Sequence, residues 1–403
     1  MRRIQLIKPE CSTNRNSNGN TGLKMAMESP TALNSVCETQ PTKLERVFCM
    51  QGGNGDTSYA KNSQGQAKHL QSLRPLLEEA LNNMDLPASE TLTIVDLGCS
   101  SGQNTLVIAN VIVNCLMNKY KLASLNMPDF QVFFSDLPSN DFNTLFQLLP
   151  VPMEVPASRT YYAAGVPGSF YKRLFPRNTL NVVHSSFSLH WLSQVPDVVL
   201  DPNSSAWNKG RVFIHSGSNE TANAYRLQFK SDFEDFLRAR SEEMKSGGCM
   251  FLVCLGRTFQ DPTNQGGGGI LFGTHFEHAW NDLVEEGMVE AERRDSFNVP
   301  FFAPTVAEVR EVVEKESSFT VNKVDVFKGG SPLVVESAEN NEELARAFTN
   351  QCRSVCGVLV DNHIGKDLST ELFSRMEKRA TEHARALVHD LQFFHVVAAL
   401  TRM

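Results

Sequence analysis

The chain has 403 residues, of which 41% are hydrophobic and 21% are charged, so collagen-like, coiled-coil and wholly disordered proteins are excluded. Its 38 basic and 45 acidic side chains give a formal net charge of −7, which excludes an overall basic surface for nucleic acid or for an anionic membrane. The sequence holds no run of 18 apolar residues, and the longest candidate, at 393–400, is too short to cross a bilayer.

Residues 1–43 differ in composition from the rest of the chain. They are rich in Asn, Ser and Thr and poor in large apolar residues, so they cannot bury enough surface to offset the entropy of ordering. Arg2 and Arg3 are not followed by the apolar segment of a secretory signal. We therefore predict a flexible leader at 1–43 and one folded domain at 44–403.

Nine cysteines are scattered along the chain without a CxxC pair. An odd number of cysteines without regular spacing indicates reduced thiols and a cytoplasmic location. Cys352 and Cys356 lie one helical turn apart, and we interpret them as two packed thiols.

Short apolar runs alternate with amphipathic stretches from residue 44 onward. This alternation predicts an α/β sheet with parallel crossovers and helices on both faces. Between 255 and 321 the pattern becomes helical, with Gly266–Gly269 as an expected hinge before a helix at 276–286, and this insert is expected to form a lid. The predicted strands are 92–97, 130–135, 180–187, 250–255 and 321–327, and the predicted sheet helices are 66–82 and 106–120.

A glycine loop follows the strand expected at 92–97. Gly98 and Gly102 are four residues apart, so the GxGxxG pattern of a nicotinamide oxidoreductase is not met. Asp96 precedes the loop, and its carboxylate suits the ammonium group of S-adenosylmethionine (SAM). Asp136 ends the next strand and suits two ribose hydroxyls. Either aspartate alone could instead cap a helix or turn, but together they favour a nucleoside that carries no phosphate.

Four segments in this order resemble the plant SABATH methyltransferases, which transfer a methyl group from SAM to carboxylates or, in some members, to purine nitrogens. The likeness runs from about Leu44 to the C-terminus. It implies an enzyme with the class I, Rossmann-like sheet of SAM-dependent methyltransferases and an α-helical cap over the active site, mainly within 260–320 and 340–390. The four segments are Gln51–Ser63, Asp96–Asn104, Gly165–Tyr171 and His184–Gln194. Four further segments, 210–215, 251–258, 269–276 and 328–335, resemble the branch that methylates indole-3-acetate.

The resemblance implies a set of residues around the cofactor. Among them, Phe170 would face the adenine, because an aromatic ring recognises a base by stacking. The implied cofactor-binding residues are Tyr59, Ser63, Asp96, Gly98, Cys99, Gly102, Asn104, Asp136, Leu137, Ser169 and Phe170.

Gln66 and Trp191 match the pair that holds the acceptor carboxylate in the family, through the amide and indole N–H groups. Without the resemblance, we would interpret Gln66 as an exposed helix residue, and Trp191 could be an aromatic residue of the core. A carboxylic acid with a pKa of about 4 is already ionised at neutral pH, so in-line transfer needs no general base. We therefore predict that this pair orients the nucleophile without neutralising it.

Phe187, His190 and Gly273 stand where relatives acting on salicylate carry Tyr, Met and Trp, and Phe393 is a fourth expected acceptor contact. The extra room favours indole-3-acetate over salicylate. We interpret His190 as a pocket wall or a satisfied core histidine and not as a base. Other acceptors stay open, namely jasmonate, benzoate, salicylate, farnesoate or a xanthine nitrogen, and so does a catalytically silent hormone-binding protein.

The resemblance also implies a metal site and a quaternary structure. Asn208, Asp295, the Phe297 carbonyl and Asn298 match the family's oxygen ligands for Mg²⁺. A turn stabilised by Asx hydrogen bonds explains the same residues almost as well. Relatives are commonly homodimers, so a homodimer is expected here.

Overall fold

The computed structural model describes residues 43–149, 160–337 and 339–403, all within one compact unit, Pro41–Met403. The expected leader therefore lies outside the described residues, apart from Lys43, which begins the short helix α1, Lys43–Val47. The seven cysteines of the described ranges are free thiols. Cys352 and Cys356 are both buried, with their sulfurs 3.6 Å apart, so they pack together as predicted.

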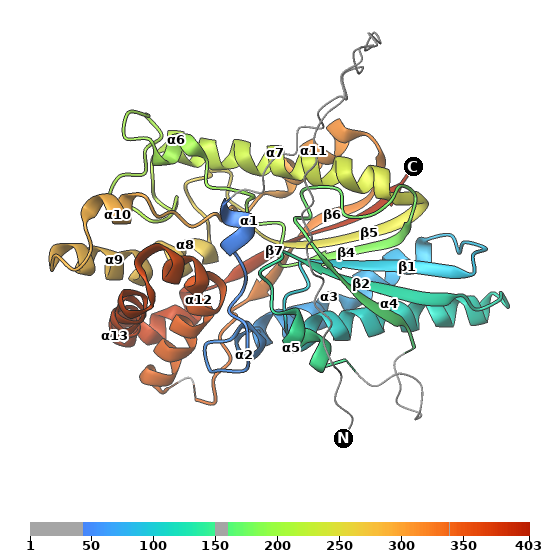
Figure 1. Ribbon diagram of the computed structural model, residues 1–403, viewed down its shortest axis with the longest axis horizontal. Coiled ribbons are helices and arrows are strands. Elements are labelled where there is room, and N and C mark those ends of the chain that lie inside the picture. The colour runs from blue at the N-terminus through green and yellow to red at the C-terminus, as the bar shows by residue number, and fades with distance from the viewer. Residues whose placement is uncertain (1–42, 150–159, 338) are drawn as a thin grey trace, which may run out of the picture. The chain divides into compact units, whose positions relative to one another are not determined.

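A seven-stranded sheet in the order β3-β2-β1-β4-β5-β7-β6 forms the centre of this unit (Figure 1). The strands from β3 to β5 are parallel, whereas β7 runs antiparallel to both of its neighbours. The sheet confirms the predicted α/β class, with one strand against the expected direction. The strands are β1 Thr91–Leu97, β2 Asp129–Asp136, β3 Tyr162–Pro167, β4 Leu180–Ser186, β5 Met244–Gly256, β6 Phe319–Gly330 and β7 Phe393–Arg402.

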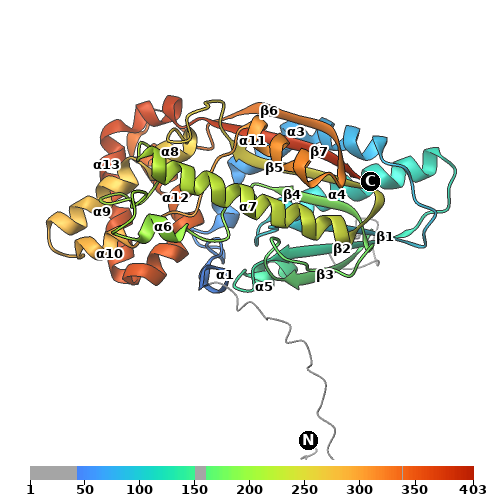
Figure 2. The ribbon, with the colours of Figure 1, turned by 90° about the horizontal axis from the view of Figure 1, so that it is seen from above.

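Helices cover both faces of the sheet (Figures 1 and 2). Helices α3, Gln64–Asn83, and α4, Gln103–Leu122, pack together on one face. Helices α7, Asn219–Glu243, and α11, Val306–Glu316, pack together on the other. Six of the seven residues of β1 are buried, as expected for a strand that has helices on both sides.

The remaining helices gather mainly at one end of the sheet (Figure 1). There α12 packs against α13, and α13 packs against α8 and α9. These helices form the cap over the carboxyl ends of the strands. They are α8 Gly267–Phe272, α9 His275–Glu285, α10 Ala291–Asp295, α12 Asn341–Ile364 and α13 Lys366–Asp390. Three short helices, α2 Tyr59–Asn62, α5 Phe142–Gln147 and α6 Asp197–Leu200, complete the unit.

The expected hinge at Gly266–Gly269 is instead mostly helical, because Gly267, Gly268 and Gly269 form the first turn of α8. All three are buried. A Cβ atom would lie 2.5 Å from the Gln392 carbonyl oxygen at Gly267 and 2.2 Å from the His215 ring at Gly269. These glycines therefore allow close packing of the helix and do not mark a flexible joint.

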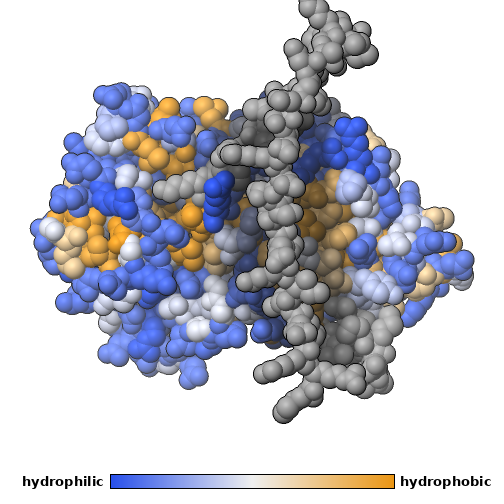
Figure 3. Space-filling model, in the orientation of Figure 1, coloured by the Kyte–Doolittle hydropathy of each residue, from blue (hydrophilic) through white to orange (hydrophobic). Residues whose placement is uncertain are grey.

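No helix in the described ranges is both long and apolar enough to cross a membrane. Hydrophilic residues make up much of the described surface in the space-filling view (Figure 3). Apolar residues show between them, notably on the side of the cap that holds α8, α9 and α10.

Candidate active site

A cavity of about 680 Å³ opens where four parallel strands end, and we call it the strand-end cavity. Its walls come from the segment 44–59 and from the loops after β1, β2, β3 and β4. The ends of these strands are the usual ligand position in an open α/β sheet. Six of the eleven predicted cofactor residues line it: Tyr59, Gly98, Asp136, Leu137, Ser169 and Phe170. The other lining residues are Leu44, Glu45, Phe48, Cys49, Met50, Ser100, Tyr171, Phe187, Ser188, Trp191, Leu192 and Ser193.

The loop after β1 requires glycine at position 98. Gly98 has a φ of +81°, which side chains rarely adopt. A Cβ atom there would also lie 2.1 Å from the hydroxyl oxygen of Ser188. This glycine lets the backbone of the loop come close to the end of β4, as the sequence pattern predicted.

Asp136 is an ionisable group that ends β2 and lines the strand-end cavity. One carboxylate oxygen accepts the Ser100 N–H at 2.7 Å, and the other accepts the Leu137 N–H at 2.8 Å. Burial raises the pKa of Asp136 to about 6, although these two hydrogen bonds oppose the shift. The carboxylate is therefore held in one orientation and keeps further lone pairs for a ligand.

The other five predicted cofactor residues, Ser63, Asp96, Cys99, Gly102 and Asn104, are not among those that line the strand-end cavity. Asp96 is buried, with one oxygen 2.7 Å from His184 Nδ1 and the other accepting the Thr105 hydroxyl. Asn104 Nδ2 donates to the Ser63 carbonyl at 3.1 Å. These residues join the start of α4 to β4 and to the α2–α3 turn, behind the cavity wall.

A second cavity of about 550 Å³ adjoins the first, and we call it the aromatic cavity. Met50, Tyr59, Phe187 and Trp191 line both cavities, so the two spaces share a wall. The predicted acceptor residues Gln66, Phe187, His190, Trp191 and Phe393 all line the aromatic cavity, with His69, Leu255, Leu271, Phe272, Phe301, Pro332, Gln351, Val355 and His395.

Gly273 is the one predicted acceptor residue that is not part of this lining. It follows α8, whose residues Leu271 and Phe272 do line the cavity. A Cβ atom on Gly273 would lie 2.8 Å from the Gly269 carbonyl oxygen and 3.0 Å from His215 Cβ. The side of the cavity at α8 is therefore set by the two preceding residues.

Trp191 is held by backbone pairing with the segment 299–305, which we call the bridge segment. Trp191 forms an isolated antiparallel bridge with Phe301. The Phe302 N–H donates to the His190 carbonyl at 2.9 Å, on one side of this bridge. The tryptophan backbone is thus fixed independently of any ligand.

The indole ring of Trp191 packs among aromatic rings. Its centroid lies 5.1 Å from that of Phe48, 5.6 Å from Phe301 and 6.1 Å from Phe272. The indole N–H has no hydrogen-bond partner within the part of the chain that the structure describes, although the residue is only 8% exposed. Because a buried indole N–H normally finds an acceptor, this group is available to a ligand in the cavities.

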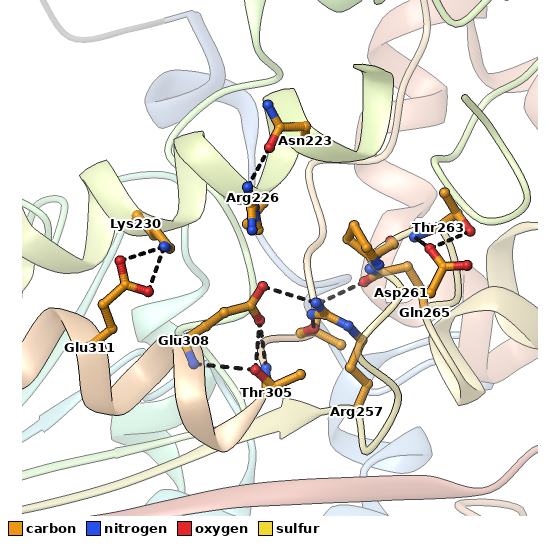
Figure 4. Close-up of polar contacts among 12 residues, drawn as sticks. Asn223, Arg226, Lys230, Arg257, Asp261, Thr263, Gln265, Thr305, Glu308 and Glu311 are labelled. Atoms are coloured by element: carbon orange, nitrogen blue, oxygen red, sulfur yellow. Dashed lines mark hydrogen bonds and ion pairs between the residues drawn. The ribbon is translucent and has the colours of Figure 1, made fainter. Parts of the chain in front are cut away.

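An internal ion pair braces the bridge segment (Figure 4). Arg257 Nη2 donates to Glu308 Oε1 at 2.9 Å, and Nη1 donates to the Ala303 carbonyl. Thr305 and Glu308 form a capping box at the start of α11. Because these contacts fix the bridge segment from behind, they also fix the backbone to which Trp191 is paired.

The histidines of the aromatic cavity are neutral at physiological pH. Burial lowers the pKa of His190 to about 3, with a smaller contribution from His395. Burial likewise lowers the pKa of His395 to about 3, and it lowers that of His69. His190 Nδ1 accepts the Leu255 N–H at 3.2 Å, so its proton sits on Nε2. These rings are poor bases and bring no positive charge to the cavity.

Comparison with known proteins identifies the family. The family described as SAM dependent carboxyl methyltransferase matches residues 45–403. The chain belongs to this family. It is 55% identical to indole-3-acetate O-methyltransferase 1 of Arabidopsis thaliana over 89% of this chain and 96% of the relative. It is 51% identical to indole-3-acetate O-methyltransferase 1 of Oryza sativa subsp. japonica, over 89% of this chain and 93% of that relative.

A solved structure shares the fold of this SAM-dependent carboxyl methyltransferase. Loganic acid methyltransferase with S-adenosylhomocysteine (SAH) has a TM-score of 0.77 and 32% identity, over 88% of this chain and 98% of the other. The class I methyltransferase fold, the enzyme class and the use of SAM are thereby confirmed.

The residues predicted to hold Mg²⁺ lie near one another in the methyltransferase, and two of their oxygens already accept hydrogen bonds within the chain. Asn298 Oδ1 accepts from Asn208 Nδ2 at 2.6 Å. Asp295 Oδ1 accepts from Gly210 N–H at 3.0 Å and from Arg294 at 2.8 Å. Within the described ranges, no group of three or more His, Cys, Asp and Glu is placed to hold a metal ion. A Mg²⁺ site is therefore not supported, and we derive no step through a metal.

Several residues that line the two cavities of the methyltransferase were not predicted. Ser100 and Ser188 lie inside the sequence segments that identified the family, so the signal for them was present. Gln351 lies on α12 and lines the aromatic cavity from the cap. It carries no local signal, because only the fold brings α12 to the carboxyl ends of the strands.

Proposed function

We propose that this methyltransferase esterifies indole-3-acetate, using SAM in the strand-end cavity and the acid in the aromatic cavity. The observation that carries the proposal is the shared wall of the two cavities, which brings a polar, strand-end site beside an aromatic one. The names and identities of the two O-methyltransferase relatives support indole-3-acetate as the acid.

In the strand-end cavity, Asp136 is assigned to the ribose hydroxyls of SAM. Its carboxylate, fixed by two backbone N–H groups, can accept from both hydroxyls. Phe170 supplies an aromatic face for the adenine. When bound, SAM supplies a methyl group activated by a sulfonium. Asp96 and Asn104 then act from behind the wall, through the contacts that orient the start of α4.

In the aromatic cavity, the Trp191 indole and the Gln66 amide are assigned to the acceptor carboxylate. Both donate hydrogen bonds without carrying a charge, so they orient the anion and leave it nucleophilic. Gln66 Oε1 is buried and has no partner within the described chain, so the amide is not committed to an internal hydrogen bond that the acid would have to replace.

Transfer in this geometry needs no base. A carboxylate oxygen forms the new bond to the methyl carbon while the carbon–sulfur bond breaks and its electron pair goes to sulfur. The negative charge of the carboxylate and the positive charge of the sulfonium cancel as the bond forms. An apolar cavity that excludes water therefore favours the less charged transition state over the separated ions. The neutral, weakly basic His190 fits a wall in this scheme.

The proposal is tested by giving the purified protein SAM and a panel of acids, and by measuring the mass of each product. We expect methyl indole-3-acetate and SAH, with slower reaction of jasmonate, benzoate, salicylate and farnesoate, because apolar pockets discriminate weakly between acids of similar size. Tight binding of indole-3-acetate without any ester would instead establish a hormone-binding protein. A faster reaction with another acid or with xanthine would replace the proposed acceptor.

Cofactor affinity is expected to depend on pH through Asp136. Only the ionised carboxylate accepts two ribose hydroxyls, and with a pKa of about 6 it becomes protonated as the pH falls below that value. The Kd for SAH, measured by calorimetry, should therefore rise by about tenfold between pH 7 and pH 5.

Two variants test whether Asp136, and not another buried carboxylate, causes this pH dependence. Asp136→Asn should bind SAH more weakly but with little change between pH 7 and pH 5. Asp232, whose pKa burial also raises to about 6, accepts hydrogen bonds from Ser193 outside the ribose contact. Asp232→Asn should therefore retain the dependence. Equal Kd values at both pH values in the unaltered protein would contradict the assignment of Asp136.

A homodimer and a cytoplasmic location complete the proposal. The first rests on the family resemblance and is tested by sedimentation equilibrium. The second is supported by the free thiols of the described residues, which suit a reducing compartment, and is tested by imaging of the tagged protein.

A further inference from the structure

The aromatic cavity contains one amide that the proposed reaction does not use. Gln351 lies on α12 and lines the cavity together with Val355, one helical turn later. The residue is only 6% exposed. Its side-chain amide makes no hydrogen bond to any of the residues that the structure describes. Neither polar atom of this amide is among the fully buried atoms without a partner, so the amide borders open space, either in the aromatic cavity or in a neighbouring pocket beside Lys61 and Pro332 that Gln351 also lines. An amide on a cavity wall with no internal hydrogen bond is free to pair with a ligand.

The position of Gln351 indicates which part of the acid it would meet. It lines the aromatic cavity from the cap helix α12, whereas Gln66, which is assigned to the carboxylate, lines it from α3 on the sheet. Its neighbours in the lining are mainly aromatic and aliphatic, such as Phe393 and Val355. An amide with such neighbours is well suited to orient one polar atom of an otherwise apolar ring.

His395 is, like Gln66, a further residue of this wall with an unpartnered atom, because its Nε2 is buried without a hydrogen bond to any described residue. Its ring edge, however, lies against the backbone of Gly329. A Cβ atom built on Gly329 would lie 2.1 Å from Cε1 and 2.9 Å from Nε2. The ring also packs against His69, with the centroids 4.6 Å apart. The edge that carries both nitrogens of His395 therefore faces the protein and not the cavity.

We infer that the side-chain carbonyl of Gln351 accepts a hydrogen bond from the ring N–H of the acceptor, and so selects aromatic acids that carry such a donor. The inference rests on the proposed function. The amide is neutral, so it does not draw the carboxylate away from Trp191 and Gln66. A wall with a buried acceptor discriminates strongly against a ring that lacks the donor, because the acceptor then stays unpaired.

The experiment compares indole-3-acetate with benzothiophene-3-acetate, a ring acid of similar shape without the N–H donor. Gln351→Met, with an apolar side chain of similar length, should lower kcat/KM for indole-3-acetate by about tenfold. The same variant should change kcat/KM for benzothiophene-3-acetate by less than about twofold. Gln351→Leu is a second variant with the same expectation, and SAH affinity measured by calorimetry shows that each variant is folded.

Asn350→Leu is the matched control, because Asn350 precedes Gln351 on α12 but lines a different pocket, between α12 and α13. It should leave both rates unchanged. An equal fall for both acids, or no fall for either, in the Gln351 variants would overturn the inference while the proposed function stands. Absence of ester from every acid with the unaltered enzyme would overturn the proposed function and this inference with it.

Discussion

Replacing Trp191 with phenylalanine is expected to reduce kcat/KM for indole-3-acetate by about 10- to 100-fold and to leave the Kd for SAH within about twofold. Phenylalanine keeps most of the packing against Phe48, Phe301 and Phe272 but lacks the N–H donor. A hydrogen bond to a charged group contributes about 1.5–3 kcal/mol, which corresponds to this range of rates. Steady-state kinetics and calorimetry with SAH measure the two effects separately.

Trp207→Phe makes the same chemical change outside both cavities. Its ring is partly exposed and lies under the Lys209 ammonium at 5.2 Å, so its kinetics should match those of the unaltered enzyme. Alanine at 191 is less informative, because it would also leave a void among three aromatic rings, costing about 3–5 kcal/mol of stability. If Trp191→Phe lost SAH affinity but retained turnover of bound acid, the indole would belong to the cofactor site and not to the acceptor.

The central sheet could be predicted from the sequence because its parallel strands are buried on both faces. Such strands are continuous apolar runs, and four predicted segments match β1, β2, β4 and β5. The fifth matches β6, which is an edge strand paired antiparallel with β7. The strand β3 was missed because it lies at the edge of the sheet and alternates partly buried with exposed residues. The apolar run at 393–400 lies within β7, but a run does not reveal which way a strand points.

The antiparallel direction of β7 follows from the long-range path of the chain. Helices α12 and α13 carry the chain into the cap after β6, and β7 then returns between β5 and β6. This insertion depends on tertiary packing and has no local sequence signal. The glycines at 267–269 also depend on tertiary packing. They allow α8 to lie close to Phe301, His215 and Gln392, which only the folded chain brings near them.

The strand-end half of the site was more predictable than the cap half. Neighbouring parallel strands bring their carboxyl ends to one edge of the sheet, so Gly98 and Asp136 could be placed together before the structure was known. The pairing of β1 with β4 sets Asp96 opposite His184, a contact that the sequence pattern did not indicate. Gln351 shows the limit on the cap side, where helix contacts decide which side chains reach the cavity.

Replacing Arg240 with methionine is expected to lower the free energy of unfolding by about 3–5 kcal/mol. Arg240 and Glu243 form an ion pair near the end of α7 in which both side chains are 0% exposed, with Nε and Oε2 2.7 Å apart. Removing the arginine leaves a buried carboxylate without its counter-charge. Calorimetric melting, with SAH binding measured beside it, tests the change in stability.

The same pair also organises the loop that carries the proposed adenine contact. Arg240 donates to the carbonyls of Phe170 and Lys172 at 2.8 and 3.0 Å, and Glu243 accepts the N–H of Phe175 at 3.0 Å. We therefore expect SAH affinity to fall by about tenfold in Arg240→Met, equivalent to about 1.4 kcal/mol. Because backbone groups depend on the pair, replacing both residues with apolar ones should not restore stability, unlike buried pairs that bond only to each other.

Arg238→Met is the matched control, because Arg238 lies on the same helix and pairs with Asp235 at the surface, with 65% of its side chain exposed. Surface pairs contribute about 0–1 kcal/mol, so this variant should melt within a degree or two of the unaltered protein and bind SAH equally well. Equal stability of Arg240→Met and Arg238→Met would show that the loop is held by its own packing. A loss of stability without a loss of SAH affinity would show that the ion pair supports the fold but does not position Phe170.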